Sequence, residues 1–157
     1  MQKLLLLIAR LALSTWVGAV ALFVVAGVRE VNSDLEPLKS AAVKNALVAT
    51  RFPAYYAFGF SLVILSLACV AAVRQRSFVS RLRRWVVLGL VGVALALMVI
   101  DYVWIYSPLL DIVTAADQVR PAEFFALHEA SKWINGASVG LCLLAATVLS
   151  WPREAVE

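Results

Sequence analysis

The sequence predicts an all-α fold, a four-helix transmembrane bundle with an additional amphipathic helix in the first outer loop. The 157 residues are 63% hydrophobic and 15% charged, with a mean hydropathy of +0.89, whereas soluble domains carry about 25% charged residues. Four apolar runs are long enough to cross a bilayer core, which needs roughly 20 residues. They cover about 4–28, 52–73, 85–106 and 124–151. The runs leave no room for a soluble domain, so we expect a single membrane domain over 1–157.

The first run, Leu4 to Val28, follows Lys3 and contains several small residues, as a signal peptide would. However, the apolar run continues well past Ala19 and Ala21, where a cleavage site would fall. We therefore interpret it as a membrane-spanning helix, because backbone polar groups find no partner in hydrocarbon unless the segment is helical.

The loop after the first run also contains a helical pattern. Small and apolar residues recur there at helical spacing: Leu38, Ala41, Ala42, Asn45 and Ala49. This spacing predicts an amphipathic helix from about Pro37 to Arg51. Pro53 lies close to the start of the second span, so the two segments either form one helix bent at Pro53 or break there.

The loop between the second and third runs sets the predicted orientation. It contains five arginines and no acid: Arg74, Arg76, Arg81, Arg83 and Arg84. Short arginine-rich loops remain on the cytoplasmic side during insertion and attract anionic lipid. We therefore expect an integral protein of the bacterial cytoplasmic (inner) membrane with both termini in the cytoplasm. Membrane orientation explains the net charge of +4 without a nucleic-acid partner.

Aromatic residues at the borders of the runs agree with this orientation. Trp85 and Trp151 fall at the predicted cytoplasmic edge, and a larger set falls at the outer edge: Tyr55, Tyr56, Tyr102, Trp104, Tyr106 and Trp133. Small residues inside the runs let helices approach closely. The predicted packing positions are Gly18, Gly89, Gly92, Gly136 and Gly140.

The fourth run opens with a polar stripe at helical spacing. Phe124, His128, Ser131 and Asn135 recur every three or four residues and so share one helix face. Lipid offers these groups no hydrogen bonds, so the face should point into the bundle. Asp101, near the outer end of the third run, is predicted to lie at the depth of His128.

A larger polar cluster is therefore predicted near the outer ends of the helices. Its members are Arg29, Glu30, Arg51, Asp101, His128, Ser131 and Asn135. Two interpretations remain open: interhelical hydrogen bonds that hold the helix ends together, or a pocket that binds a ligand or handles protons.

Enzyme and cofactor chemistry find little support in the sequence. A single histidine cannot supply a two-histidine haem site, and His128, Asp101 and Glu129 are too few for a usual zinc site. Both cysteines, Cys69 and Cys142, fall inside apolar runs without metal or redox spacing. We predict no catalytic residues, no metal site and no cofactor, and we do not expect the protein to be an enzyme.

Three segments give the chain a resemblance to a known family. These are Trp16-Val17-Gly18, Tyr102 through Pro108, and Phe124 with Leu127, His128, Ser131 and Asn135. On them the chain resembles the domain of unknown function 4149 family, small bacterial membrane proteins related to the transmembrane protein 205 group. The resemblance implies a four-helix membrane fold but no activity. The chain departs from the family pattern at 27–32 and at Asp101.

The function predicted first is an accessory or structural subunit that packs in a membrane complex. Its expected partners are the lipid bilayer and other membrane chains, or further copies of itself. The alternative is a small transporter or ligand-binding membrane module with an outward-facing polar pocket around Asp101 and His128.

Overall fold

The computed structural model describes residues 1–73, 80–115 and 121–152. The elements are α1 (Gln2–Val31), α2 (Glu36–Lys39), α3 (Ala41–Ala72), α4 (Arg81–Ile100), the π-helix η1 (Asp101–Tyr106), α5 (Ser107–Thr114) and α6 (Ala122–Ser150). The all-α prediction is confirmed. Four helices are long and apolar enough to cross a membrane, because α4, η1 and α5 form one continuous helix from Arg81 to Thr114. The chain is a membrane protein of the helix-bundle class.

The segment predicted as one amphipathic helix from Pro37 to Arg51 is helical except at Ser40, an extended residue that separates two helices. Its first residues belong to α2 and the remainder forms the first turns of α3. Pro53 lies inside α3, which runs through it as one helix of 32 residues. Of the two alternatives at Pro53, the continuous helix is therefore the one found.

The third span is longer than predicted and changes its winding near its outer end. We expected it to end at Tyr106, but η1 and α5 extend it to Thr114. Pro108 explains the change, because a proline ring collides with the carbonyl four residues before it, here that of Trp104. The wider turn avoids this collision, and the Ser107 N–H bonds to the Tyr102 carbonyl, five residues back. Such π segments are frequent at functional sites.

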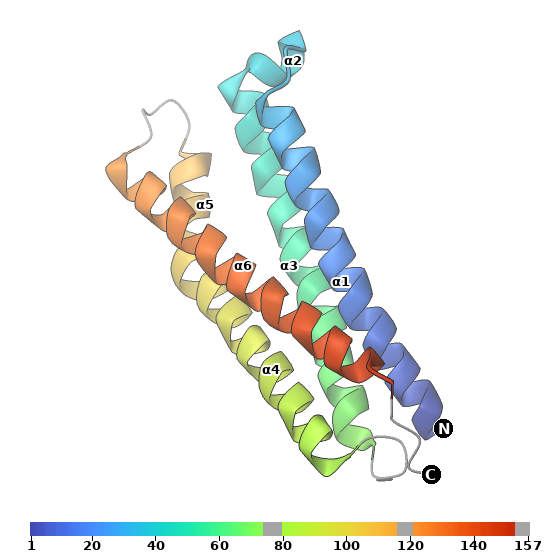
Figure 1. Ribbon diagram of the computed structural model, residues 1–157. Helices are drawn as coiled ribbons and strands as arrows, with labels where there is room; N and C mark the ends of the chain where they lie inside the picture. The colour runs from blue at the N-terminus through green and yellow to red at the C-terminus, as the bar shows by residue number, and fades with distance from the viewer. Residues whose placement is uncertain (74–79, 116–120, 153–157) are drawn as a thin grey trace.

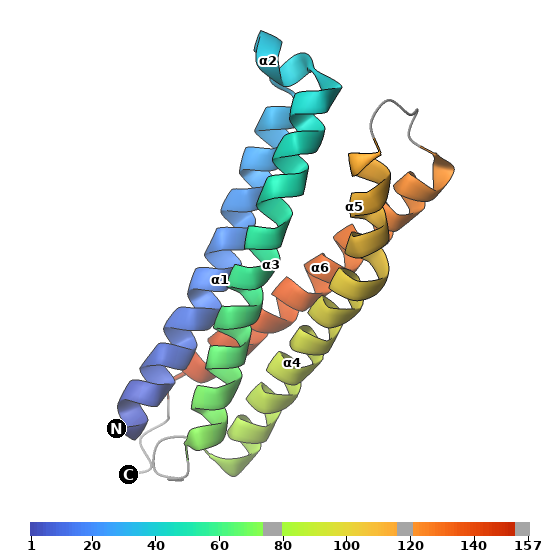
Figure 2. The same ribbon diagram turned by 180° about the vertical axis from the view of Figure 1, so that it is seen from behind.

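The helices form two antiparallel pairs that cross. Figures 1 and 2 show α1 beside α3, and α4 with η1 beside α6. The pairs pack together near the start of α1 and the end of α6, and they separate toward α2 and α5. We call segments 2–16, 59–72, 81–98 and 138–150 the closed half, and segments 17–58, 101–115 and 121–137 the open half.

The closed half contains most of the apolar core. Its fully buried side chains come from all four spans and include Leu13, Val63, Val70, Val87, Val91, Cys142 and Leu149. Gly59, at the border of the two halves, is the glycine against which side chains of neighbouring helices pack. A Cβ atom there would lie 2.5 Å from Cη2 of Trp16 and 2.8 Å from Cε of Met98.

The predicted packing glycines do not serve this purpose within the chain. A Cβ atom at Gly18, Gly89, Gly92, Gly136 or Gly140 would meet nothing within 4 Å. Small residues permit close approach only where a partner helix lies opposite, and in this chain the partner lies opposite Gly59. The prediction identified small residues correctly but could not show which of them face a neighbour.

Two arginines of the predicted cytoplasmic cluster donate hydrogen bonds to carbonyl groups at the ends of neighbouring helices. The Arg83 guanidinium donates to the carbonyls of Val148 and Trp151, both at 2.5 Å, and Arg84 donates to the Ala71 carbonyl at 2.7 Å. These bonds satisfy the free carbonyls at the ends of α6 and α3, where a positive charge is also favourable. Arg74 and Arg76 lie outside the described residues.

Candidate functional site

The site centres on Asp101, the first residue of η1. Its side chain is 0% exposed. The Tyr56 hydroxyl from α3 donates to Asp101 Oδ2, and Nδ2 of Asn135 from α6 donates to the same oxygen at 2.5 Å. Three spans therefore meet at one carboxyl group. Asp101 Oδ1 is buried and has no hydrogen-bond partner.

Asn135 extends this arrangement into a chain of polar groups. Its Oδ1 accepts a hydrogen bond from the Tyr55 hydroxyl at 3.1 Å. Its Nδ2 also lies 3.0 Å from the Ser131 carbonyl oxygen and 3.2 Å from Ser131 Oγ. The structure thus brings together three predicted site residues, Asp101, Ser131 and Asn135, and adds two tyrosines.

Tyr55 and Tyr56 were predicted only as part of the outer aromatic belt. A tyrosine hydroxyl that leaves water usually needs a hydrogen-bond partner. Tyr56 is 1% exposed, so its hydroxyl had to find such a group inside the bundle. The position of the two tyrosines near the start of the second apolar run indicated the aromatic belt. No sequence pattern links them to Asp101, which lies 45 residues away from Tyr56.

Aromatic rings surround the polar chain. This aromatic shell comprises Trp16, Phe23, Phe52, Tyr55, Tyr56, Phe60, Tyr102 and Tyr106, linked by ring contacts. The ring centroid of Tyr56 lies 4.8 Å from that of Tyr106 and 5.1 Å from that of Tyr102. Tyr56 also bonds to Asp101, so it links these rings to the buried carboxyl group.

Two further polar atoms in the shell are buried without a hydrogen-bond partner. They are Nε1 of Trp16 and the hydroxyl of Tyr106. Trp16 packs on Tyr55 with ring centroids 4.9 Å apart. Together with Asp101 Oδ1, the shell holds one free donor, one free acceptor and one hydroxyl that can act as either. Leaving such groups unpaired in a buried place costs free energy.

Asp101 was expected to lie at the depth of His128, and the structure places it beside Asn135 instead. The hydrogen bonds to Asp101 come from Tyr56 and Asn135, whereas His128 is exposed and stacks on Phe124 with ring centroids 5.7 Å apart. Asn135 lies seven residues further along α6, about 10 Å in a helix that rises 1.5 Å per residue. As expected, the polar face of α6 points inward at Asn135. The depth of Asp101, however, corresponds to that of Asn135 and not to that of His128.

Glu30 and Arg51 form a separate ion pair in the open half. Arg51 Nη1 lies 2.5 Å from a Glu30 carboxylate oxygen. The Arg51 guanidinium also lies 5.4 Å from the ring centroid of Phe23, a member of the aromatic shell. Arg29 is exposed on α1. The predicted cluster of seven residues is therefore divided between a buried group around Asp101, the Glu30–Arg51 pair, and the exposed Arg29 and His128.

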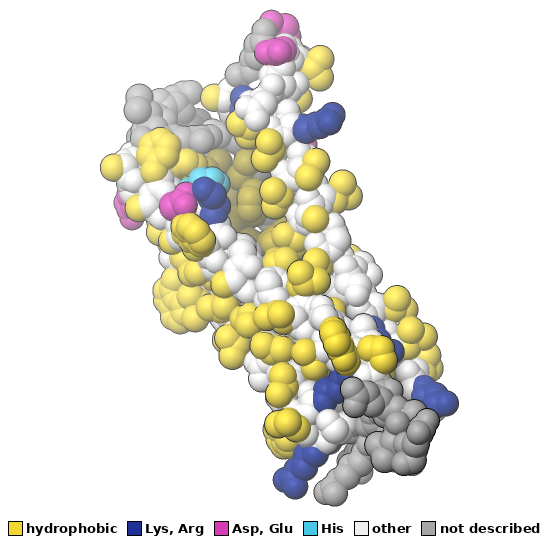
Figure 3. Space-filling view, viewed as in Figure 1, with side chains coloured by type: hydrophobic (Ala, Val, Ile, Leu, Met, Phe, Trp, Pro, Cys, Tyr) yellow, Lys and Arg dark blue, Asp and Glu magenta, His cyan; other side chains and the backbone are white. Residues whose placement is uncertain are grey.

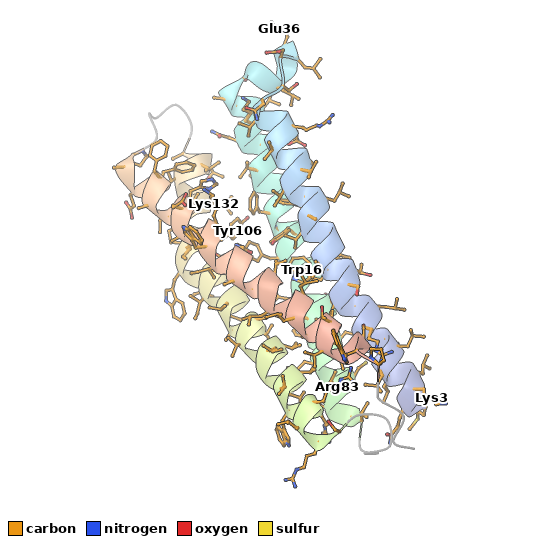
Figure 4. The ribbon with its side chains drawn as sticks, viewed as in Figure 1. Lys3, Trp16, Glu36, Arg83, Tyr106 and Lys132 are labelled. Carbon is orange, nitrogen blue, oxygen red and sulfur yellow. The ribbon has the colours of Figure 1, made fainter. Side chains whose placement is uncertain are left out.

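A hollow lies beside the site on the surface between the two helix pairs. Figure 3 shows it between the upper part of α6 and the pair α1 and α3, with hydrophobic side chains inside and the single histidine at its edge. In Figure 4, Tyr106 lies between α6 and α3, and Lys132 extends from the upper part of α6. Lys132 is paired with Glu129 at 2.6 Å.

The donor set does not resemble a metal centre. Within residues 1–73, 80–115 and 121–152, no group of three histidine, cysteine, aspartate or glutamate side chains could hold a metal ion. Cys69 and Cys142 are buried free thiols. The chemistry that the site offers is hydrogen bonding and charge, from one carboxyl group among aromatic rings.

Comparisons with protein families, with curated proteins and with solved structures found no match to this chain.

Proposed function

We propose that the protein is a small membrane module that binds a small solute through the carboxyl group of Asp101 and carries it across the membrane. The observation that supports this proposal is the unpaired oxygen of Asp101. Among the described residues, Asp101 is the one charged side chain that is buried, and its Oδ1 has no partner. An ionisable group inside a membrane bundle is expensive and marks a functional site by default.

A purely structural role would not require this arrangement. Helices joined by Asn135 and Tyr55 need only neutral hydrogen bonds, which contribute about 0.6 kcal/mol each in membranes. A buried carboxyl group with a free oxygen instead costs stability unless something supplies the missing partner. A solute that donates to Asp101 Oδ1 would supply it.

We propose that the hollow opens outward. The described arginines Arg81, Arg83 and Arg84 belong to the closed half, and α1 begins and α6 ends at that end of the molecule. By the positive-inside rule this end lies in the cytoplasm. The proposed location is the bacterial cytoplasmic membrane, with the open half toward the outer side.

Ligand-dependent thermal unfolding of the purified protein in detergent tests the proposal. The solutes are propylammonium, 1-propanol, glucose and propionate, applied to the wild type, Asp101→Asn and Asp111→Asn. A solute that binds, present at a concentration of about one hundred times its Kd, stabilises the folded state by about 2.7 kcal/mol. We expect at least one solute to raise the unfolding temperature of the wild type and of Asp111→Asn, but not of Asp101→Asn.

Asp111 provides the matched control because it is an exposed acid on the neighbouring α5. A second measurement does not depend on the folding of a variant. Dicyclohexylcarbodiimide should modify Asp101 of the wild type, and the stabilising solute should protect it, as detected by mass spectrometry of the peptide. The proposal is wrong if no solute discriminates between the variants and none protects Asp101.

A second function, packing as a subunit with another membrane chain, is supported by the glycines. Gly18, Gly89 and Gly136 are exposed, with open space where a Cβ atom would lie, so a helix of another chain could approach closely there. Light scattering of the detergent complex tests this role. Self-association that is lost in Gly89→Leu and retained in Val93→Leu would support it, and a monomer in both would contradict self-association.

A further inference from the structure

We infer that the solute is a small organic ammonium ion, held between Asp101 Oδ1 and the ring faces of the aromatic shell. This inference rests on the proposed function and adds the chemical class of the ligand. It follows from the charge of the site, the arrangement of the rings and a cation that the chain itself already places on the shell.

The charge of the site favours a cation. Both hydrogen-bond donors to Asp101, Tyr56 and Asn135, are neutral. The nearest arginine of the shell, Arg51, is already paired with Glu30 at 2.5 Å. A buried carboxylate is retained at least cost when a positive charge and hydrogen bonds accompany it. An anionic solute would meet repulsion there, and a neutral solute would leave the charge uncompensated.

Tyr56, which bonds to Asp101, and the two rings in contact with it suit the apolar and cationic parts of an ammonium ion. Tyr56, Tyr102 and Tyr106 have ring centroids 4.8 to 5.6 Å from one another. A cation within about 6 Å of a ring centroid is attracted by the negative face of the ring, and more strongly where water is excluded. The shell therefore adds to the attraction of the carboxylate without supplying a second charge.

Arg51 shows that this shell accepts a cation. Its guanidinium lies 5.4 Å from the ring centroid of Phe23, which packs against Tyr55 at 4.7 Å. Tyr55 in turn donates to Asn135, which donates to Asp101. The Glu30–Arg51 pair and the proposed ammonium–Asp101 pair thus have the same composition: one carboxylate, one cation and an aromatic face.

The free hydroxyl of Tyr106 gives the ammonium group a second acceptor. It is buried without a partner, and the Tyr106 ring contacts that of Tyr56, whose hydroxyl bonds to Asp101. Figure 4 shows Tyr106 between α6 and α3, toward the hollow. Since Asp101 has no exposed surface, side chains between the hollow and the carboxyl group must move when the ion enters.

Isothermal titration calorimetry with propylammonium and its neutral counterpart 1-propanol tests the inference. We expect propylammonium to bind the wild type at least about ten-fold more tightly than 1-propanol, because only the cation gains the charge-assisted bond and the ring attraction. Asp101→Asn should abolish this preference, and Asp111→Asn should retain it. Tyr106→Leu should weaken propylammonium binding about ten-fold, and Tyr106→Phe, which keeps the ring, should weaken it less.

The outcomes separate this inference from the proposed function. If 1-propanol or glucose binds in an Asp101-dependent way and propylammonium does not, the ligand class is wrong and the proposed function stands. If propylammonium binds equally to the wild type and to Asp101→Asn, the inference is overturned. If no tested solute depends on Asp101, both fail. If the variants do not fold, the wild type still tests the inference, because bound propylammonium should protect Asp101 from modification by the carbodiimide.

Discussion

The closed and open halves use the same four spans for different purposes. In the closed half, buried positions are apolar apart from Ser66 and Ser138 and carry no charge, and Arg83 and Arg84 direct their N–H groups to carbonyls at the ends of other helices. In the open half, the pairs separate and the buried positions include the carboxyl group of Asp101 and two tyrosines, Tyr56 and Tyr106. The difference suggests that tight packing in one half makes an unpaired charge tolerable in the other.

The energetic reason lies in the solvent. In a bilayer, helices gain no hydrophobic free energy by leaving lipid for one another, so close packing must stabilise the bundle. Many small dispersion contacts supply that packing. A group such as Asp101 lowers this stability, so substitutions should behave in opposite ways in the two halves.

The largest expected effect comes from Trp16→Ala. Trp16 is 1% exposed and lies against Gly59 and Tyr55. Its loss should lower the free energy of unfolding by about 3–5 kcal/mol, because the cavity cannot collapse. Unfolding in detergent measures the change, with Trp133→Ala as the control since Trp133 is 74% exposed. Equal losses for the two tryptophans would contradict the proposed importance of packing at this border.

Gly59→Ala should destabilise the protein by about 1–3 kcal/mol through overpacking. The added Cβ atom would lie 2.5 Å from Cη2 and 2.7 Å from Cζ2 of Trp16, so a ring or a helix must shift. Gly140→Ala adds the same methyl group to a helix where nothing lies within 4 Å. If thermal unfolding shows the same change in both variants, Gly59 is not the close contact between the spans.

Asp101→Asn should have the opposite sign and stabilise the ligand-free protein by about 1 kcal/mol. The amide keeps an oxygen for Tyr56 and Asn135 while removing a buried charge that lacks a full set of partners. Denaturation in detergent without added solute measures this. A loss of stability would indicate that the carboxyl group holds the helices together, which is the structural interpretation of the polar cluster.

The smallest effect is expected for His128→Ala. His128 is exposed and contacts Phe124 by ring stacking. Surface substitutions usually change stability by no more than about 0.5 kcal/mol, and propylammonium affinity should also be retained. Calorimetry and thermal unfolding of the same sample check both. Loss of binding would return His128 to the site and place the ligand higher in the hollow.

The inward face of α6 could be predicted, but the partner of Asp101 could not. Residues spaced by three and four share a helix face whatever surrounds the helix, so Ser131 and Asn135 were placed together correctly, whereas His128 is exposed. Depth is different, because it depends on the crossing of the two helix pairs and on the extra length of η1. That offset selected Asn135, seven residues from His128.

The sequence alone determined the four spans, because a bilayer requires long apolar helices and this demand is local to each segment. The effect of Pro108 is equally local, since a proline ring collides within its own helix, but the π-helix before it was not predicted and the span was expected to end at Tyr106. Only the tertiary structure decided that Gly59 rather than the other glycines meets a neighbour, and that Tyr56 reaches Asp101. Those contacts join residues far apart in the chain, and their geometry exists only once the helices have packed.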